Sequence, residues 1–133
     1  MQREHSRSEL QRKLQTRFAD FTYIAPVLDG LEEQGYLDDE RFLQAYLTVR
    51  KRKGFGPLRI RAELQERGLS SGLIASYLEE QDSEWYQLMQ QAAATKAGNL
   101  AESSHASQQK LARFLEYRGF PVSMIRRYLW DGD

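Results

Sequence analysis

The sequence contains an internal repeat, and this repeat limits the possible folds more strongly than any other feature of the chain. Five sets of residues match between three copies, at spacings of 50 and then 51 residues: Leu10/Ile60/Leu111, Leu14/Leu64/Leu115, Arg17/Arg67/Arg118, Ile24/Ile74/Ile125 and Leu28/Leu78/Leu129. A glycine follows the arginine in copies two and three (Gly68 and Gly119), whereas copy one has Phe18 there. Units with such a period stack on their neighbours, so we expect an elongated, curved molecule.

Each copy has the pattern of two helices joined by a short turn, and a further helix precedes this pair in copies two and three. Apolar residues recur with the helical period, and no segment shows the alternation typical of a strand. We therefore predict that the 133 residues form one all-α domain of tandem three-helix repeats. The repeats are expected at about residues 3–36, 37–82 and 83–133.

Capping and turn residues mark the expected ends of the helices. Ser6 and Glu9 have the spacing of a capping box, and Gly54 followed by Pro57 stands where one helix ends and the next begins. Further N-caps and C-terminal glycines are expected at Thr22, Ser70 or Ser71, Ser83, Gly35, Gly68 and Gly119. The clustered carboxylates of residues 38–40 are expected to cap a helix and to complement its dipole rather than to bind a cation.

The apolar spacing also predicts which side chains face the core. The first helix is expected to carry one apolar face with these residues: Leu10, Leu14, Phe18 and Phe21. For the helix that begins at Asp38, the expected stripe is Phe42, Ala45, Tyr46 and Val49. Trp85, Tyr117 and Trp130 are expected to be core or inter-repeat contacts. Residues 97–107 lack a period and read as a loop.

Positive charge gathers in two parts of a chain whose net charge is +0. Between residues 50 and 67, two acidic residues stand against seven basic ones: Arg50, Lys51, Arg52, Lys53, Arg59, Arg61 and Arg67. A second basic group comprises Lys110, Arg113, Arg118, Arg126 and Arg127. Such charges either form a solvated face that complements a helix dipole or present a surface to an anionic partner. Arg67 and Arg118 occupy matched repeat positions, which also allows a structural role.

Phe55 lies in the turn between the basic residues and has two interpretations. It can pack as the hydrophobic contact that follows a helix C-cap. It can also be an exposed aromatic on which a base or a partner side chain stacks.

The sequence contains no constellation of residues that indicates catalysis. His5 and His105 stand in polar surroundings and are expected to be solvated, and Gly54-Phe55-Gly56 does not continue into a nucleotide-binding motif. We therefore expect no enzyme activity, no metal site and no cofactor. The absence of cysteine fits a reducing compartment, and no run of 18 apolar residues is present, so we expect a cytoplasmic protein that does not enter a membrane.

Several runs of residues occur together in this sequence: Gly35–Phe42, Arg50–Leu64 and Arg67–Leu69 in the centre, Arg3–Ser6 with Glu9-Leu10 and Lys13-Leu14 near the start, and Phe114-Leu115 with Arg118–Phe120 near the end. In these runs the sequence resembles the RecX family of regulatory proteins. The resemblance covers nearly the whole chain. Family members usually carry more residues before the Arg3–Ser6 stretch, so we expect the first helix of repeat one to be missing or shortened.

The resemblance implies a modulator of the RecA recombinase, usually an inhibitor, with RecA and the RecA–DNA filament as partners. It implies effects on recombination, ATP hydrolysis and the co-protease function of the SOS response, and it implies no catalytic residues. We expect a monomer whose partner-binding residues are Phe55 and the basic side chains of the two groups other than Arg118. The alternative is a stand-alone nucleic-acid-binding helical protein that affects RecA only by competing for DNA, and weak direct contact with DNA stays open.

Overall fold

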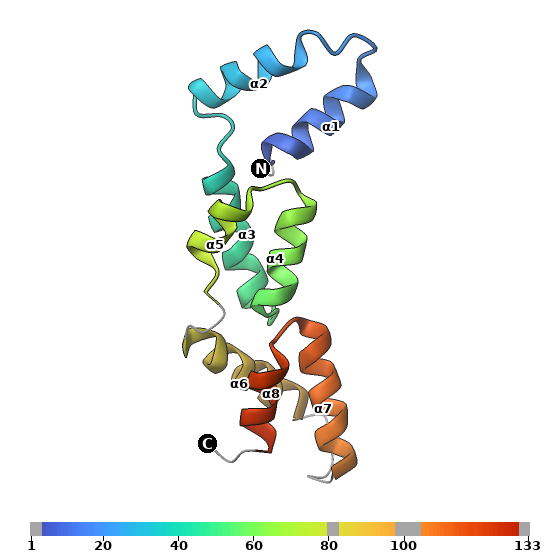
Figure 1. Cartoon of the computed structure of the whole chain (residues 1–133), viewed down its shortest axis with the longest axis vertical. Coiled ribbons are helices and arrows are strands. Elements are labelled where there is room, and N and C mark those ends of the chain that lie inside the picture. Colours follow the sequence, from blue (N-terminus) through green and yellow to red (C-terminus); the bar gives the residue numbers. More distant parts are fainter. Residues whose placement is uncertain (1–3, 80–82, 98–104, 131–133) are drawn as a thin grey trace. The chain divides into compact units, whose positions relative to one another are not determined.

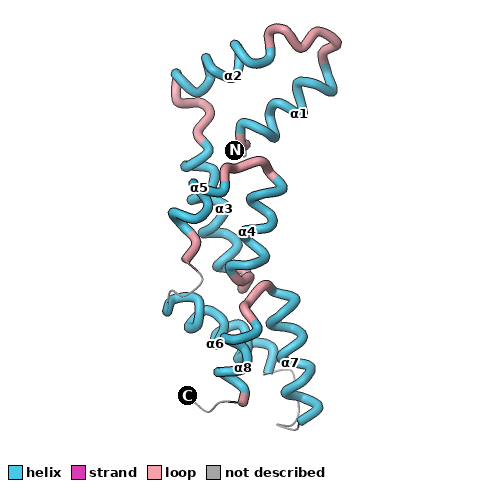
Figure 2. The backbone as a smooth tube through the Cα atoms, viewed as in Figure 1, coloured by secondary structure: helices cyan, strands magenta, loops and turns pink. Residues whose placement is uncertain are grey.

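The computed structural model describes residues 4–79, 83–97 and 105–130, and within these stretches the chain forms helices and no strand. Figure 1 shows the helices in chain order, and Figure 2 shows the same backbone with helices and loops distinguished. The helices are α1 (Arg7–Arg17), α2 (Ile24–Glu33), α3 (Asp39–Arg52), α4 (Pro57–Glu66), α5 (Ser71–Tyr77), α6 (Ser83–Ala97), α7 (His105–Arg118) and α8 (Val122–Leu129). The predicted all-α class is confirmed. None of the helices in the described stretches is long and apolar enough to cross a membrane.

The chain forms two compact units. Unit 1 comprises residues Met1–Thr48 and Glu63–Tyr77, and unit 2 comprises residues Val49–Ala62 and Leu78–Asp133. Unit 1 therefore contains α1, α2 and α5 with the first part of α3 and the end of α4. Unit 2 contains the end of α3, the start of α4 and all of α6, α7 and α8.

The apolar cluster of the first repeat lies in unit 1. Ile24, Leu28 and Leu37 are buried, and Leu10, Leu14 and Leu31 pack against them. The first helix ends at Arg17, because Phe18 takes an extended conformation as the C-cap residue. The expected continuation through Phe21 is therefore wrong, and Phe18 and Phe21 are both exposed.

The core face of α3 differs from the expected stripe. The buried residues are Phe42, Leu43 and Leu47, while Ala45 and Val49 are exposed. The expected stripe follows the i, i+3, i+4, i+7 spacing from Phe42, and this spacing omits Leu43 and Leu47. Burying these leucines removes more apolar surface from water than burying alanine and valine does, so the helix is rotated toward them.

Polar contacts join α3 to α4 and to α5 in repeat two. The hydroxyl of Tyr46 on α3 donates to Glu63 Oε1 on α4, at 2.9 Å. On α5, the hydroxyl of Tyr77 donates to Glu40 and accepts a hydrogen bond from Gln44. The bond to Glu40 raises the pKa of Tyr77, because it stabilises the neutral phenol.

The helix ends follow the predicted chemistry. Ser6 and Glu9 form a complete capping box, and Asp38 Oδ1 accepts hydrogen bonds from the first backbone amides of α3. Positive φ angles occur at the glycines that follow α2, α3, α4 and α7: Gly35, Gly54, Gly68 and Gly119. Thr22 does not cap α2, whose N-cap residue is Tyr23.

Two other expectations meet mixed outcomes. Trp85 is buried as expected, and Tyr117, although exposed, makes an expected inter-repeat contact with Arg59 of α4, whereas Trp130 is exposed. The expected loop at 97–107 is too long, because α6 continues to Ala97 and α7 begins at His105. Residues 98–104 lie outside the described residues.

Candidate partner-binding site

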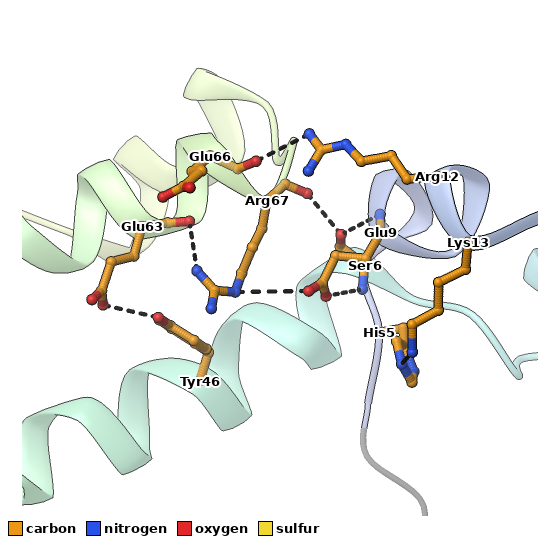
Figure 3. A network of polar contacts seen from close by, with 9 residues as sticks. All are labelled: His5, Ser6, Glu9, Arg12, Lys13, Tyr46, Glu63, Glu66 and Arg67. Atoms are coloured by element: carbon orange, nitrogen blue, oxygen red, sulfur yellow. Dashed lines mark hydrogen bonds and ion pairs between the residues drawn. The ribbon is translucent and has the colours of Figure 1, made fainter. Parts of the chain in front are cut away.

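Two junctions join neighbouring repeats, and each lies within one unit. In junction one, the first turn of α1 meets the Arg67-Gly68 turn that ends α4 (Figure 3). Ser6 Oγ donates to the carbonyl of Arg67 at 2.7 Å, and Ser8 Oγ donates to the carbonyl of Gly68 at 3.4 Å. The carbonyls at the end of α4, which have no partner within the helix, are satisfied in this way.

Arg67 is held inside junction one. Its guanidinium lies 4.7 Å from the ring centroid of Tyr46 and donates to the carbonyl of Glu63 at 3.2 Å. Glu9 Oε2 lies 3.8 Å from the buried Nε, which donates no hydrogen bond within the described residues. Figure 3 shows these groups converging from α1, α3 and α4. Of the two roles left open for Arg67, the geometry supports the structural one.

Junction two repeats this backbone arrangement in unit 2. The amide of Gly56 donates to the carbonyl of Arg118 at 2.7 Å, and the amide of Leu58 donates to the carbonyl of Gly119 at 3.0 Å. Gly119 has a φ of 101°, and a Cβ there would lie 2.6 Å from the backbone nitrogen of Arg59. Only glycine fits this approach, which explains why the repeat pattern contains one.

Phe55 stands beside junction two and is surrounded by guanidinium groups. Arg50, Arg59 and Arg118 lie 3.7, 4.6 and 4.7 Å from its ring centroid. The ring is half-buried, so neither simple packing nor a free stacking surface describes it. Cation–π attraction gives the ring a third role, because it gathers three charges at one place. We call Phe55 and these three arginines the arginine cluster.

Further contacts hold two of the arginines in place. Arg118 Nη1 donates to the carbonyl of Lys53 at 2.7 Å, and the guanidinium lies 4.9 Å from the ring of Phe114. Arg59 Nη1 donates to the carbonyl of Tyr117 at 3.2 Å, and the Arg59 guanidinium lies 4.9 Å from the ring centroid of Tyr117. Guanidinium groups fixed in this way lose less conformational entropy when they bind an anion.

A cavity of about 260 Å³ adjoins the arginine cluster. The described residues that line the cavity are Lys51, Arg52, Lys53, Gly54, Leu88, Gln91, Ala92, Thr95, Phe114 and Arg118. Four of these residues are basic and none is acidic. Lys51 is paired with Glu84 at 2.6 Å, whereas the lining residues Arg52 and Lys53 are exposed. The basic cavity can therefore accept an oxyanion, with an apolar wall beside the charges.

The other predicted binding residues lie apart from this cavity. Arg61 is half-buried on α4. Apart from Arg118, the second basic group lies exposed on two helices, with Lys110 and Arg113 on α7 and Arg126 and Arg127 on α8. Arg127 contacts the ring of Tyr86 at 4.5 Å. None of these five residues lines the cavity or contacts Phe55 in the described structure.

Sequence reasoning did not place Gln91, Thr95 and Phe114 at the site. These side chains come from α6 and α7, and no local pattern connects them with the turn at Gly54. The repeat position of Arg118 and the basic residues around it both drew attention to this arginine. They did not decide between a structural and a binding role. No group of three or more His, Cys, Asp or Glu in the described stretches could hold a metal ion.

Comparison with known proteins identifies the family. Models of the second and third three-helix domains of RecX match residues 38–78 and 82–129. The chain belongs to the RecX family. The Regulatory protein RecX of Pseudomonas putida (strain GB-1) is 41% identical over 131 residues, which cover 98% of this chain and 84% of the relative. RecX of Ectopseudomonas mendocina (strain ymp) is 40% identical over 132 residues, covering 98% of this chain and 87% of the relative.

A solved RecX structure has the same fold. The crystal structure of RecX from Lactobacillus salivarius superimposes with a TM-score of 0.81 at 19% identity, covering 96% of this chain and 85% of that one. At this identity the likeness shows the fold alone. The tandem helical repeat expected from the sequence is therefore confirmed, as is the resemblance to RecX.

Proposed function

We propose that this RecX-family chain binds the RecA recombinase and its filament on DNA, and thereby inhibits the recombinase, ATPase and co-protease activities of RecA in the cytoplasm. The observation that carries the proposal is the match to curated regulatory RecX proteins over 98% of the chain. By inhibiting RecA, the chain regulates DNA repair and the SOS response. The chain acts by occupying its partner rather than by catalysis.

The arginine cluster and the basic cavity are the contact surface that we propose. They offer fixed guanidinium groups, two exposed cations and an apolar wall, all within unit 2. Acidic side chains of a protein partner and phosphates of bound DNA both suit this surface. The exposed cations of α7 and α8 form a second, separate contact. Two contacts on one chain raise its avidity when both engage the same filament.

Binding to three partners in parallel tests the proposal: single-stranded DNA, free RecA, and RecA assembled on that DNA with a slowly hydrolysed nucleotide. We expect the filament to be preferred at near-physiological salt. Equal binding to bare DNA with a steep dependence on salt would instead favour the nucleic-acid-binding alternative. Binding to none of the three would contradict both.

Charge reversal at Arg52 and Lys53 tests the contact surface. Both side chains are exposed, so Arg52→Glu/Lys53→Glu should leave the helical content unchanged. We expect filament affinity to fall at least about tenfold, because two cations at an acidic surface become anions. The matched control is Lys13→Glu/Arg17→Glu, which makes the same charge change on exposed residues of α1. An equal loss of filament affinity in both variants would show a general effect of charge. Arg52 and Lys53 would then not belong to the contact surface.

A further inference from the structure

The basic cavity beside the arginine cluster differs from a simple charged surface, because one of its walls is uncharged. All of its described lining residues belong to unit 2. Its volume of about 260 Å³ is below the roughly 300–1,000 Å³ that is typical of sites for drug-sized molecules. The cavity therefore holds one small group, such as a single nucleotide or a single amino-acid side chain.

Arg118 is a fixed anion-binding group in this cavity. Its guanidinium carbon lies 4.7 and 4.9 Å from the ring centroids of Phe55 and Phe114, so both rings contact the guanidinium. Of its several N–H donors, one bonds to the carbonyl of Lys53 within the described residues. Further donors along the edge of the guanidinium remain for an oxyanion, and their fork matches two oxygens of one phosphate or carboxylate.

The positive charge of the cavity exceeds what the neighbouring helix ends require. Both α3 and α7 end at the cavity, and each helix C-terminus acts as about half a negative charge. Lys51 is paired with Glu84. Three positive charges then remain among the described lining residues, those of Arg52, Lys53 and Arg118. The two helix ends offset about one of them. A phosphate monoester, with about −1.5 to −2 charges at pH 7, matches the remainder better than a single carboxylate does.

The residues that α6 contributes to the cavity are uncharged. Leu88 and Ala92 form an apolar surface together with Phe114 of α7. Gln91 adds an amide that both donates and accepts hydrogen bonds. The hydroxyl of Thr95 donates to the backbone carbonyl of Gln91 at 3.1 Å, so its oxygen stays available as an acceptor. A nucleobase has the matching composition, with stacking faces and a polar edge. A carboxylate side chain would leave this wall uncovered.

We propose that the basic cavity binds one nucleoside phosphate, with the phosphate at Arg52, Lys53 and Arg118 and the base on the uncharged wall of α6. A free nucleotide and one nucleotide of a single DNA strand share this chemistry. The inference rests on the contact surface of the proposed function, and it selects phosphates over acidic side chains as the ligand of the cavity.

Small probes added to the whole chain test this inference without RecA. AMP, adenosine and inorganic phosphate are titrated separately at constant ionic strength, and NMR follows the methyl resonances of Leu88, Ala92 and Thr95. AMP should shift these resonances and bind at least about tenfold more tightly than adenosine or phosphate, because only AMP contacts both the charges and the apolar wall. No shift with AMP would overturn the inference. Phosphate that binds as tightly as AMP would also overturn it, because the cavity would then accept any small anion.

Two further probes distinguish the sources of the ligand. The first is an octamer of deoxyadenosine without a terminal phosphate, compared with AMP at near-physiological salt. Tighter binding of AMP would assign the cavity to a free nucleotide, and tighter binding of the octamer at the same methyl groups would assign it to a DNA strand. The second probe is a hexaglutamate peptide. If it shifts these methyl groups and binds more tightly than both nucleotide probes, the ligand is an acidic protein segment and the inference is wrong.

Gln91→Glu and Gln90→Glu form a matched pair of variants. The two glutamines are exposed neighbours on α6, and of the two only Gln91 is among the described residues that line the cavity. The same isosteric change therefore adds one negative charge inside the cavity or outside it. Gln91→Glu should weaken AMP binding at least about tenfold, because like charges repel within one cavity. Gln90→Glu should change it by less than about twofold, because water screens the charge. Equal effects of the two variants would overturn the inference.

Two results separate this inference from the proposed function. A chain that binds the RecA filament but gives no shift with AMP would contradict the nucleoside phosphate site alone. A chain that binds AMP but not the filament would contradict the proposed function alone.

Discussion

The two junctions have the same backbone scheme but opposite electrostatics. In each, an Arg-Gly turn offers two carbonyls to the first turn of an earlier helix. Junction one satisfies them with the hydroxyls of Ser6 and Ser8. Junction two uses the amides of Gly56 and Leu58, which occupy the same repeat positions. The geometry of the repeat therefore depends on where donors are placed, and different residues can supply them.

The two junctions differ in the charged residues that they bring together. The repeat position of Glu9, which lies beside Arg67 in junction one, is occupied by Arg59 in junction two. Arg59 and Arg118 then lie over the same ring, that of Phe55. Junction one places opposite charges side by side, whereas junction two brings like charges together. Departures of this kind from favourable charge pairing are typical of functional sites. The contrast supports a structural role for junction one and a binding role for junction two.

The largest expected effect is that of Gly119→Ala at junction two. The new Cβ would lie 2.6 Å from the backbone nitrogen of Arg59, and the φ of 101° is strained for alanine. We expect a loss of about 3 kcal/mol in the free energy of unfolding, measured by urea denaturation.

Gly68→Ala provides the comparison at junction one. There the Cβ meets the side chain of Ser8 at 2.2 Å, while the nearest backbone atom of Ser8 is 3.8 Å away. Adding Ser8→Gly to Gly68→Ala should therefore restore part of the lost stability. The backbone clash at Gly119 has no such remedy. If both alanine variants lose the same stability and Ser8→Gly restores none of it, the two junctions are not distinguished by these contacts.

A smaller effect is expected from Glu9→Gln at junction one. The amide keeps an oxygen for the Ser6 backbone amide, which bonds to Glu9 Oε1 at 3.2 Å, but it removes the charge beside Arg67. Because the Nε of Arg67 is buried, we expect a loss of about 1 kcal/mol in the free energy of unfolding. Glu116→Gln, at an exposed position of α7, is the control and should have no measurable effect. A loss at Glu9 no larger than this control would show that the charge at junction one is dispensable.

Much of the fold could be predicted because repeats and caps are local signals. The capping box at Ser6 and the glycines after α2, α3, α4 and α7 were read correctly from neighbouring residues. The core face of α3 was misread because the choice between Val49 and Leu47 depends on what lies opposite, which a single helix does not contain. For Tyr117 both a core position and an inter-repeat contact were expected, and the structure shows the second, since its ring lies over Arg59 at the surface.

The candidate site could be predicted only in part. Charge counting located Arg50 and Arg59 within one basic stretch, but it could not distinguish them from Arg67, which is paired in junction one. The assembly around Phe55 joins residues more than 60 positions apart in the chain, such as Arg118 and Lys53. Arg118 reaches Phe55 only because the repeats stack on each other. The repeat spacing alone did not show which residues lie between the two side chains.

The smallest effect on stability, and the sharpest test of the contrast, is expected from Arg59→Glu. This change gives junction two the charge arrangement of junction one. The variant loses the contacts of Arg59 with Phe55 and Tyr117, each worth about 0.5–1 kcal/mol at a partly exposed site. It gains a carboxylate near Arg118 and removes a like charge, so we expect the free energy of unfolding to change by less than about 1 kcal/mol.

Anion binding should respond to the same variant much more strongly. Sulfate bound by the arginine cluster would raise the midpoint of thermal unfolding relative to chloride at equal ionic strength, since a ligand of the folded state stabilises it. Sulfate also stabilises proteins without binding, so Arg17→Glu, at an exposed position of α1, sets the baseline. We expect Arg59→Glu to show a smaller sulfate increment than Arg17→Glu. Equal increments would mean that the arginines around Phe55 hold the repeats together as Arg67 does, and the two junctions would then share one structural role.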